Sequence, residues 1–224
     1  MGDGKGADAL IAFWRRLKCS GTTIEAVAID MSPAYIQAVR ENLPNAVVVF
    51  DHFHVIKLYT DRLSDFRRQL FNQMEDAQKK QVIKGTRWLL LKNPENLSDV
   101  RSEPDRLKAA LELNRPLAAA YYMKEDLRQV WNQPDKETAK GFLTDWVYRA
   151  GSSMIPMLVK MAHTIATHFH GILAYYDFPI STGPLEGTNN KIKTMKRQAY
   201  GFRDHWFFKL KIMALHEAKY ALVG

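Results

Sequence analysis

Two aspartates directly follow short apolar segments that are typical of β-strands. Residues 24–29 end at Asp30, and residues 46–50 end at Asp51. Ligands collect at the carboxyl ends of neighbouring parallel strands, and carboxylate oxygens are the ligands that Mg²⁺ prefers. The pair is therefore a candidate cation site. A strand-end aspartate also commonly caps the turn that follows it, so a purely structural role stays open for both residues.

The second strand end also carries two imidazoles, His52 and His54. Two histidines at this spacing could bind a transition metal, but no cysteine or distant third ligand accompanies them. We therefore expect His54 to form a hydrogen bond within the site or to pack against it.

A third carboxylate, Glu186, lies in the segment 183–193. At about 100° per residue, Glu186, Asn190, Lys193 and Arg197 project within an arc of about 60° on one helix face. A glutamate near a helix N-terminus also complements the helix dipole, which is the structural alternative. Because an amide and two cations share its face, we expect Glu186 to be functional. The opposite side holds residues that we expect to pack: Leu185, Ile192, Met195 and Ala199.

The segment from Lys191 to Lys211 mixes cations with aromatic residues. It has seven Lys or Arg residues against one acidic residue. Cations contact phosphates and aromatic rings stack on exposed bases, so this mixture suits a distorted or partly unpaired DNA end. A solvated basic face with core aromatics is the competing interpretation. The candidate DNA-contacting residues are Lys191, Lys193, Lys196, Arg197 and Arg203.

Composition narrows the class of protein. The 224 residues are 46% hydrophobic, as in a globular protein, and their formal net charge of +8 favours an anionic partner such as nucleic acid. The single cysteine, Cys19, excludes an intrachain disulfide framework and a cysteine-based zinc site, and favours a reducing, cytoplasmic location. No apolar run of about 18 residues is present, so we expect no membrane partner.

The elements that must position these residues begin with a helix, a strand, a helix and a strand. Residues 9–17 follow helical spacing and end at Gly21, and Ser32-Pro33 starts the second helix. The order predicts a parallel, right-handed unit whose second strand, residues 46–50, is fully buried. Two strands cannot bury both faces of a parallel sheet, so further strands are expected upstream or from a partner.

The rest of the chain has a helical pattern. From residue 55 to about residue 152 it is interrupted near Gly85, at 93–94, at 114–116 and at 133–134. A further helix carries Leu158, Met161, Ile165 and Phe169. A loop over residues 177–184 then leads into the helix of Glu186, and a last helix is expected over residues 205–220.

Five segments carry a family resemblance. In chain order they are GDGKG at 2–6, AIDMSPAY at 28–35, VFDHFHV at 49–55, KGTRWLLLKN at 84–93 and GPLEGTNNKIK at 183–193. Together they resemble the insertion-sequence transposases of the ISL-three family, which have a DDE catalytic domain. The segments span nearly the whole chain in the order of the family, and that combination is far more specific than any one of them.

The resemblance implies a fold class: α/β and predominantly helical, with a partial RNase H-like core interrupted by a long all-helical insertion. The implied domains are a partial sheet segment at 1–54, the insertion at 55–178 and C-terminal helices at 179–224 that complete the core. It also implies bacterial origin and association with the nucleoid.

The resemblance also implies Mg²⁺-dependent DNA strand cleavage and transfer, in which Mn²⁺ can substitute. Asp30 would be the second acidic metal ligand and Glu186 the third. Asp51, His54 and Asn190 would support the site, and in an alternative assignment Asp51 is itself a metal ligand. The implied partners are insertion-sequence terminal repeats, target DNA, and either further copies of this chain or an intact transposase.

The first of the three acidic metal ligands that the family resemblance implies has no convincing counterpart in this sequence. The first acidic residue of such a core lies on an earlier strand, and the 29 residues before Asp30 contain one helix and one strand. Asp3 and Asp8 occupy an expected loop and helix start, so neither is a convincing substitute. We therefore expect a fragment of a catalytic domain. The alternative is an inactive remnant that binds DNA or an intact transposase. A third interpretation is a helical protein without a nucleic-acid role, which would require the basic segment 191–211 to be inert.

Overall fold

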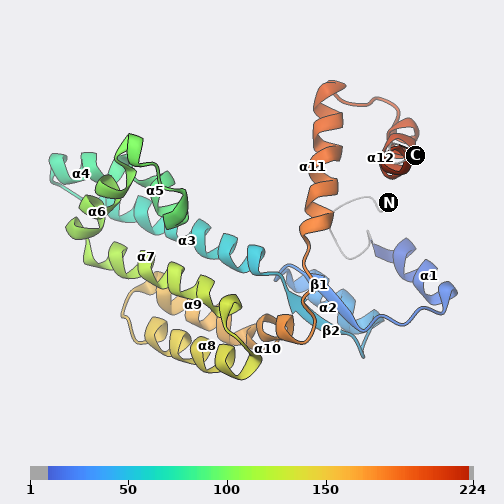
Figure 1. Cartoon of the computed structure of the whole chain (residues 1–224), viewed down its shortest axis with the longest axis horizontal. Coiled ribbons are helices and arrows are strands. Elements are labelled where there is room, and N and C mark those ends of the chain that lie inside the picture. The colour runs from blue at the N-terminus through green and yellow to red at the C-terminus, as the bar shows by residue number, and fades with distance from the viewer. Residues whose placement is uncertain (1–9, 222–224) are drawn as a thin grey trace. The chain divides into compact units, whose positions relative to one another are not determined.

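The computed structural model describes residues 10–221 and is predominantly helical, with two parallel strands (Figure 1). This confirms the mostly helical α/β class. The strands are β1 (Ala26–Ile29) and β2 (Val47–Phe50). The α-helices are α1 (Ile11–Ser20), α2 (Pro33–Asn42), α3 (His52–Gln73), α4 (Ala77–Lys84), α5 (Arg87–Leu91), α6 (Glu103–Leu113), α7 (Arg115–Arg128), α8 (Lys136–Gly151), α9 (Pro156–Thr167), α10 (Phe169–Leu173), α11 (Gly183–Gln198) and α12 (His205–Ala221). Short 3-10 helices are η2 (Pro94–Asn96), η3 (Asp99–Arg101), η4 (Gln129–Asn132) and η5 (Ala174–Tyr176).

The chain groups into two compact units, and each is described by itself. Among the described residues, the first unit comprises α1, α2, α11 and α12. The second unit, Ala26–Ser32 with Val47–Ile180, comprises both strands and the helices from α3 to α10. No helix within the described residues is long and apolar enough to cross a membrane.

The strands pair in parallel, as the sequence predicts, and Ile29 lies opposite Phe50. The expectation of a fully buried second strand is wrong. Val49 and Phe50 are buried, but Val47 is 37% exposed. A two-stranded sheet lacks neighbouring strands, so its residues are buried only where another element covers them. That cover comes from α10, whose Gly171 packs against the Phe50 ring.

Local sequence signals account for several helix ends. Gly21 ends α1 in the left-handed conformation (φ 63°), which costs glycine little because it has no Cβ. Asn114 starts α7, since its side chain accepts a hydrogen bond from the Leu117 N–H at 2.9 Å. The predicted helix through Phe169 is divided in two. Its first part, α9, ends at Thr167, and α10 begins after His168.

The helices of the second unit share one core built on α3. Tyr59 and Leu63 of α3 are fully buried, and the Tyr59 hydroxyl donates to the Ala120 carbonyl of α7 at 2.6 Å. Trp146 of α8 is also fully buried and donates its indole N–H to the Met123 carbonyl at 2.8 Å. Both polar atoms are therefore satisfied inside the core, and each bond ties two helices together.

Two buried charges hold the end of α5 in place. The Lys124 ammonium donates to the carbonyls of Leu90 and Lys92 at 2.7 and 3.1 Å. These carbonyls lie at the helix C-terminus, where they lack partners within the helix and a cation is favoured. Glu103 accepts from the Lys92 ammonium at 2.6 Å and from the Ser98 N–H at 2.9 Å. The segment after α5 is thus fixed by charge-assisted bonds.

Candidate active site at the strand ends

The two strand-end aspartates are brought together by the register of the sheet. Ile29 and Phe50 are opposite each other, so Asp30 and Asp51 leave adjacent strands at the same edge. The Asp51 N–H donates to the Ile29 carbonyl at 3.3 Å and extends the pairing by one residue. The structure therefore has two neighbouring carboxylates at the edge where ligands bind in open α/β sheets.

Each carboxylate also has a local structural role. Asp51 is 2% exposed and caps α3, since its Oδ1 accepts from the Phe53 N–H at 2.8 Å. Asp30 is partly buried, and its Oδ1 accepts from the Ser32 N–H at 3.0 Å. These bonds fix the orientation of both side chains before any ligand binds. Capping and ligand binding are thus compatible here, because a carboxylate has two oxygens.

Aromatic rings lie close to His52, the residue that follows Asp51. The His52 Nδ1 lies 3.5 Å from the Asp51 Oδ1. The His52 ring centroid is 5.9 Å from that of Trp131 and 6.5 Å from that of Tyr175. Sequence reasoning missed Trp131 and Tyr175, because they come from η4 and η5 and no periodic pattern marks them. The half-exposed His52 is therefore close to rings of η4 and η5, whereas His54 lies next to the Phe53 ring.

Glu186 lies in the first turn of α11, in the other compact unit. Its N–H donates to the Thr182 carbonyl at 2.9 Å, so the helix begins as the sequence predicts. The side chain is partly buried, and Asn190 one turn later is exposed. Among the described residues, no group of three or more His, Cys, Asp or Glu side chains is placed to hold a metal ion. Asp3 and Asp8 lie outside the described residues.

The expected packing side of α11 is not observed. No residue of α11 is buried, and Leu185 is 62% exposed. Ile192 and Met195 are partly buried, and Ala199 is exposed. The helix is amphipathic in sequence, but the described part of its unit contains too few elements to cover the apolar side.

The predicted DNA-contacting residues are all exposed: Lys191, Lys193, Lys196, Arg197 and Arg203. The aromatic residues that follow behave in two ways. Phe202 and Phe208 stack with ring centroids 4.9 Å apart, as core residues do. Tyr200 and Trp206 are strongly exposed, at 102% and 70%. The segment therefore combines accessible cations with two rings that are available for stacking.

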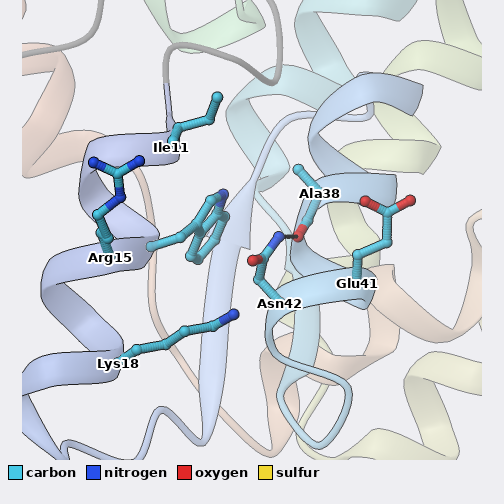
Figure 2. A pocket seen from close by; sticks show the side chains of 7 residues that line it. Ile11, Arg15, Lys18, Ala38, Glu41 and Asn42 are labelled. Atoms are coloured by element: carbon cyan, nitrogen blue, oxygen red, sulfur yellow. Dashed lines mark hydrogen bonds between the residues drawn. The ribbon is translucent and has the colours of Figure 1, made fainter.

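A cavity of about 380 Å³ lies within the first unit, between α1 and α2 (Figure 2). Arg15 and Lys18 of α1 border it on one side, and Glu41 and Asn42 of α2 on the other. Trp14 also lines it. None of the predicted site residues lines this cavity, and its mixed charges match neither a metal site nor a phosphate site.

The chain is similar to known transposases. The sequence matches the ISL-three type of the DDE transposase family over residues 1–212. It is 36% identical over 217 residues to the transposase for insertion sequence element IS1001 of Bordetella parapertussis, which covers 96% of this chain and 53% of that protein. It is 30% identical over 202 residues to the transposase for insertion sequence element IS1557 of two Mycobacterium tuberculosis strains. That match covers 80% of this chain and 45% of those proteins.

The chain spans about half the length of these curated relatives. No solved structure matches it.

Proposed function

Because the chain belongs to the ISL-three family of DDE transposases, we propose that it forms part of a catalytic domain that cuts and joins DNA at insertion-sequence ends. The observation that carries the proposal is the placement of Asp30 and Asp51 at adjacent strand ends. The proposal concerns the complete protein, of which this chain supplies the later acidic residues.

The donor set at the strand ends fits a divalent cation. Oxygen ligands suit Mg²⁺, and Mn²⁺ accepts the same donors. Asp30 uses its Oδ1 for the Ser32 N–H, which leaves Oδ2 for a cation. Asp30 and Glu186 would hold the metal, and Asp51 is either a further ligand or a support. When bound, divalent metal would activate the attacking oxygen and stabilise the leaving one in an in-line displacement at phosphorus.

The surrounding residues position the site. The cap formed by Asp51 fixes the start of α3, from which His52 and His54 project. His54 and Asn190 are proposed to support the carboxylates through hydrogen bonds, since an imidazole and an amide can both donate. These contacts would orient the acidic side chains and restrict the water that reaches them.

We propose an RNase H-like core for the complete protein. The segments 1–54 and 179–224 would belong to it, and the helical segment 55–178 would be an insertion between them. The parallel strands and the long helical segment that follows β2 support this division.

DNA is the proposed partner. The exposed cations of α11 and Arg203 would contact the phosphates of a terminal repeat, and Tyr200 and Trp206 would stack on unpaired bases. Further copies of this chain, or an intact transposase, would assemble with it on the DNA.

The experiment is a nicking assay. Supercoiled plasmid and a linear terminal-repeat duplex are incubated with the chain in Mg²⁺ and in Mn²⁺, alongside Asp30→Asn and Glu186→Gln. Glu137→Gln is the matched control, because Glu137 also lies in the first turn of a helix and is exposed. Any metal-dependent nicking by the chain should be lost in both site variants and kept in the control.

Two results would count against the proposal. Nicking that survives Glu186→Gln would exclude that residue as a ligand. No nicking by the parent chain, together with salt-sensitive DNA binding that persists in both site variants, would instead favour a binding module that regulates or accompanies an intact transposase.

A further inference from the structure

Three arginines from three helices converge on one turn of the insertion. The turn joins α4 to α5, and Figure 1 shows α3, α4, α5 and α6 together at this end of the second unit. The Arg67 guanidinium of α3 donates to the Ile83 carbonyl at 3.3 Å. Arg106 of α6 donates to the Gly85 carbonyl at 3.4 Å. Arg87 is the first residue of α5 and follows the same turn directly.

No carboxylate of a described residue neutralises these three guanidinium groups. None of the three forms an ion pair with a described side chain. Arg68, which follows Arg67, is paired with Asp65 at 3.1 Å. Burial lowers the pKa of Arg67, and the positive charges of Arg87 and Arg68 lower it further. Like charges held together at a cost in free energy are typical of a site whose anion is supplied by a ligand.

The hydrogen-bonding capacity of the cluster is also unfilled. The Arg67 Nε is buried and has no partner among the described residues. Arg87 and Arg106 are exposed, so their remaining N–H groups face solvent. A guanidinium group offers five donors in a planar fork that matches phosphate oxygens. Arg87 and Arg106 can therefore present several phosphate contacts within a small area, and the charge of the partly buried Arg67 adds to theirs.

An exposed indole adjoins the cations. Trp88 is 65% exposed, and the Arg87 guanidinium lies 4.8 Å from its ring centroid. A large aromatic surface left in solvent beside cations is suited to a sugar or base next to a bound phosphate.

We propose that the turn between α4 and α5, with Arg67, Arg87, Arg106 and Trp88, is a second DNA-backbone contact of this chain, separate from the basic segment of α11 and α12. The inference rests on the proposed function in taking DNA as the partner, but it requires no cleavage. Contacts on both compact units would let the chain hold DNA at two places at once.

The test is a salt titration of DNA binding. Fluorescence anisotropy measures the affinity for a labelled duplex in EDTA, where metal-dependent cleavage does not operate. The log of the binding constant falls with log salt concentration by about 0.9 for each phosphate contact. We expect Arg87→Gln with Arg106→Gln to reduce that slope by about 2 and to weaken binding at least about tenfold near 0.1 M salt.

Two control variants separate the effect of the position of the charges at this turn from the effect of net charge. Lys108→Gln with Lys140→Gln removes the same charge from exposed positions of the same unit, and Lys108 lies about 200° around α6 from Arg106. That variant should keep the slope of the parent. Arg87→Lys with Arg106→Lys keeps both charges and should restore most of the slope, which a folding defect would not. Thermal unfolding midpoints check that all four proteins are folded.

Several outcomes would overturn the inference. If the glutamine variant at the turn keeps the slope of its Lys108 and Lys140 control, the turn makes no phosphate contact. A chain that nicks DNA with an unchanged slope would retain the proposed function and lose this inference. Loss of slope without any nicking by the parent would do the reverse.

Discussion

Gly171 of α10 lies against Phe50 of β2 so closely that a Cβ at position 171 would stand 2.4 Å from Phe50 Cδ2 and 3.2 Å from the Val48 carbonyl oxygen. Phe50 is the residue before Asp51, and its ring also contacts His168 at a centroid distance of 4.8 Å. Gly171 and His168 therefore pack against the residue that precedes the buried Asp51.

Gly171→Ala is expected to displace Phe50 and destabilise the fold. Overpacking a filled site costs about 1–3 kcal/mol, and the ring cannot move away without disturbing the strand end. Urea unfolding followed by circular dichroism gives the free energy of unfolding. Gly141→Ala in α8 is the matched control, because nothing lies within 4 Å of that position. It should be neutral or should stabilise the helix by about 0.5–1 kcal/mol. Equal effects of the two substitutions would refute the close contact.

Substitutions of Asp51 separate its structural role from its role in the site. Asp51→Ala removes the cap of α3 and should cost about 0.5–2 kcal/mol, whereas Asp51→Asn keeps a capping oxygen and should be nearly neutral. If Asp51 supports the metal ligands, Asp51→Asn should lower nicking by about 10–100-fold, as the loss of an outer partner does. Complete loss of nicking in a stable Asp51→Asn protein would instead make Asp51 a metal ligand.

Glu103 should make stability depend on acidic pH. Its hydrogen bond from Lys92, and then the one from the Ser98 N–H, lower the pKa of Glu103 below its ordinary value of 4.5. The unfolded chain thus takes up this proton first, so the stabilisation is complete above about pH 4.5 and is lost as the pH falls toward the folded pKa. Unfolding free energies measured across that range should fall less steeply in Glu103→Gln. Lys92→Met should flatten the curve in the same way, and an unchanged slope in both variants would contradict the pairing.

Tyr59 should make stability fall at alkaline pH. Burial, and then the charge of Asp126, raise the pKa of Tyr59 well above its ordinary value of 10.0. Burial also raises the pKa of Tyr121 to about 12. The folded protein keeps these protons where the unfolded chain releases them, so stability decreases as the pH rises above about 10. Tyr59→Phe should weaken that decrease. At neutral pH it should cost about 1 kcal/mol, through the lost bond to the Ala120 carbonyl. A decrease as steep as in the parent would show that Tyr59 ionises freely.

Much of the fold could be predicted from local signals. Gly21, Asn114 and the proline of Ser32-Pro33 mark helix ends through backbone conformation and capping, which depend on a few adjacent residues. The parallel pairing of the strands followed from the helix between them. The positions of Asp30 and Asp51 at one sheet edge were predictable for the same reason.

The sequence by itself determined the elements, the strand-end carboxylates and the family, because these are encoded in periodicity, caps and motifs. Only the tertiary structure decided that β2 is half covered and that His52 lies near Trp131 and Tyr175. It also decided that Arg67 and Arg106 both donate to carbonyls around the turn between α4 and α5. Those relationships join residues far apart in the chain. They depend on how whole helices pack, and no local pattern of residues records that packing.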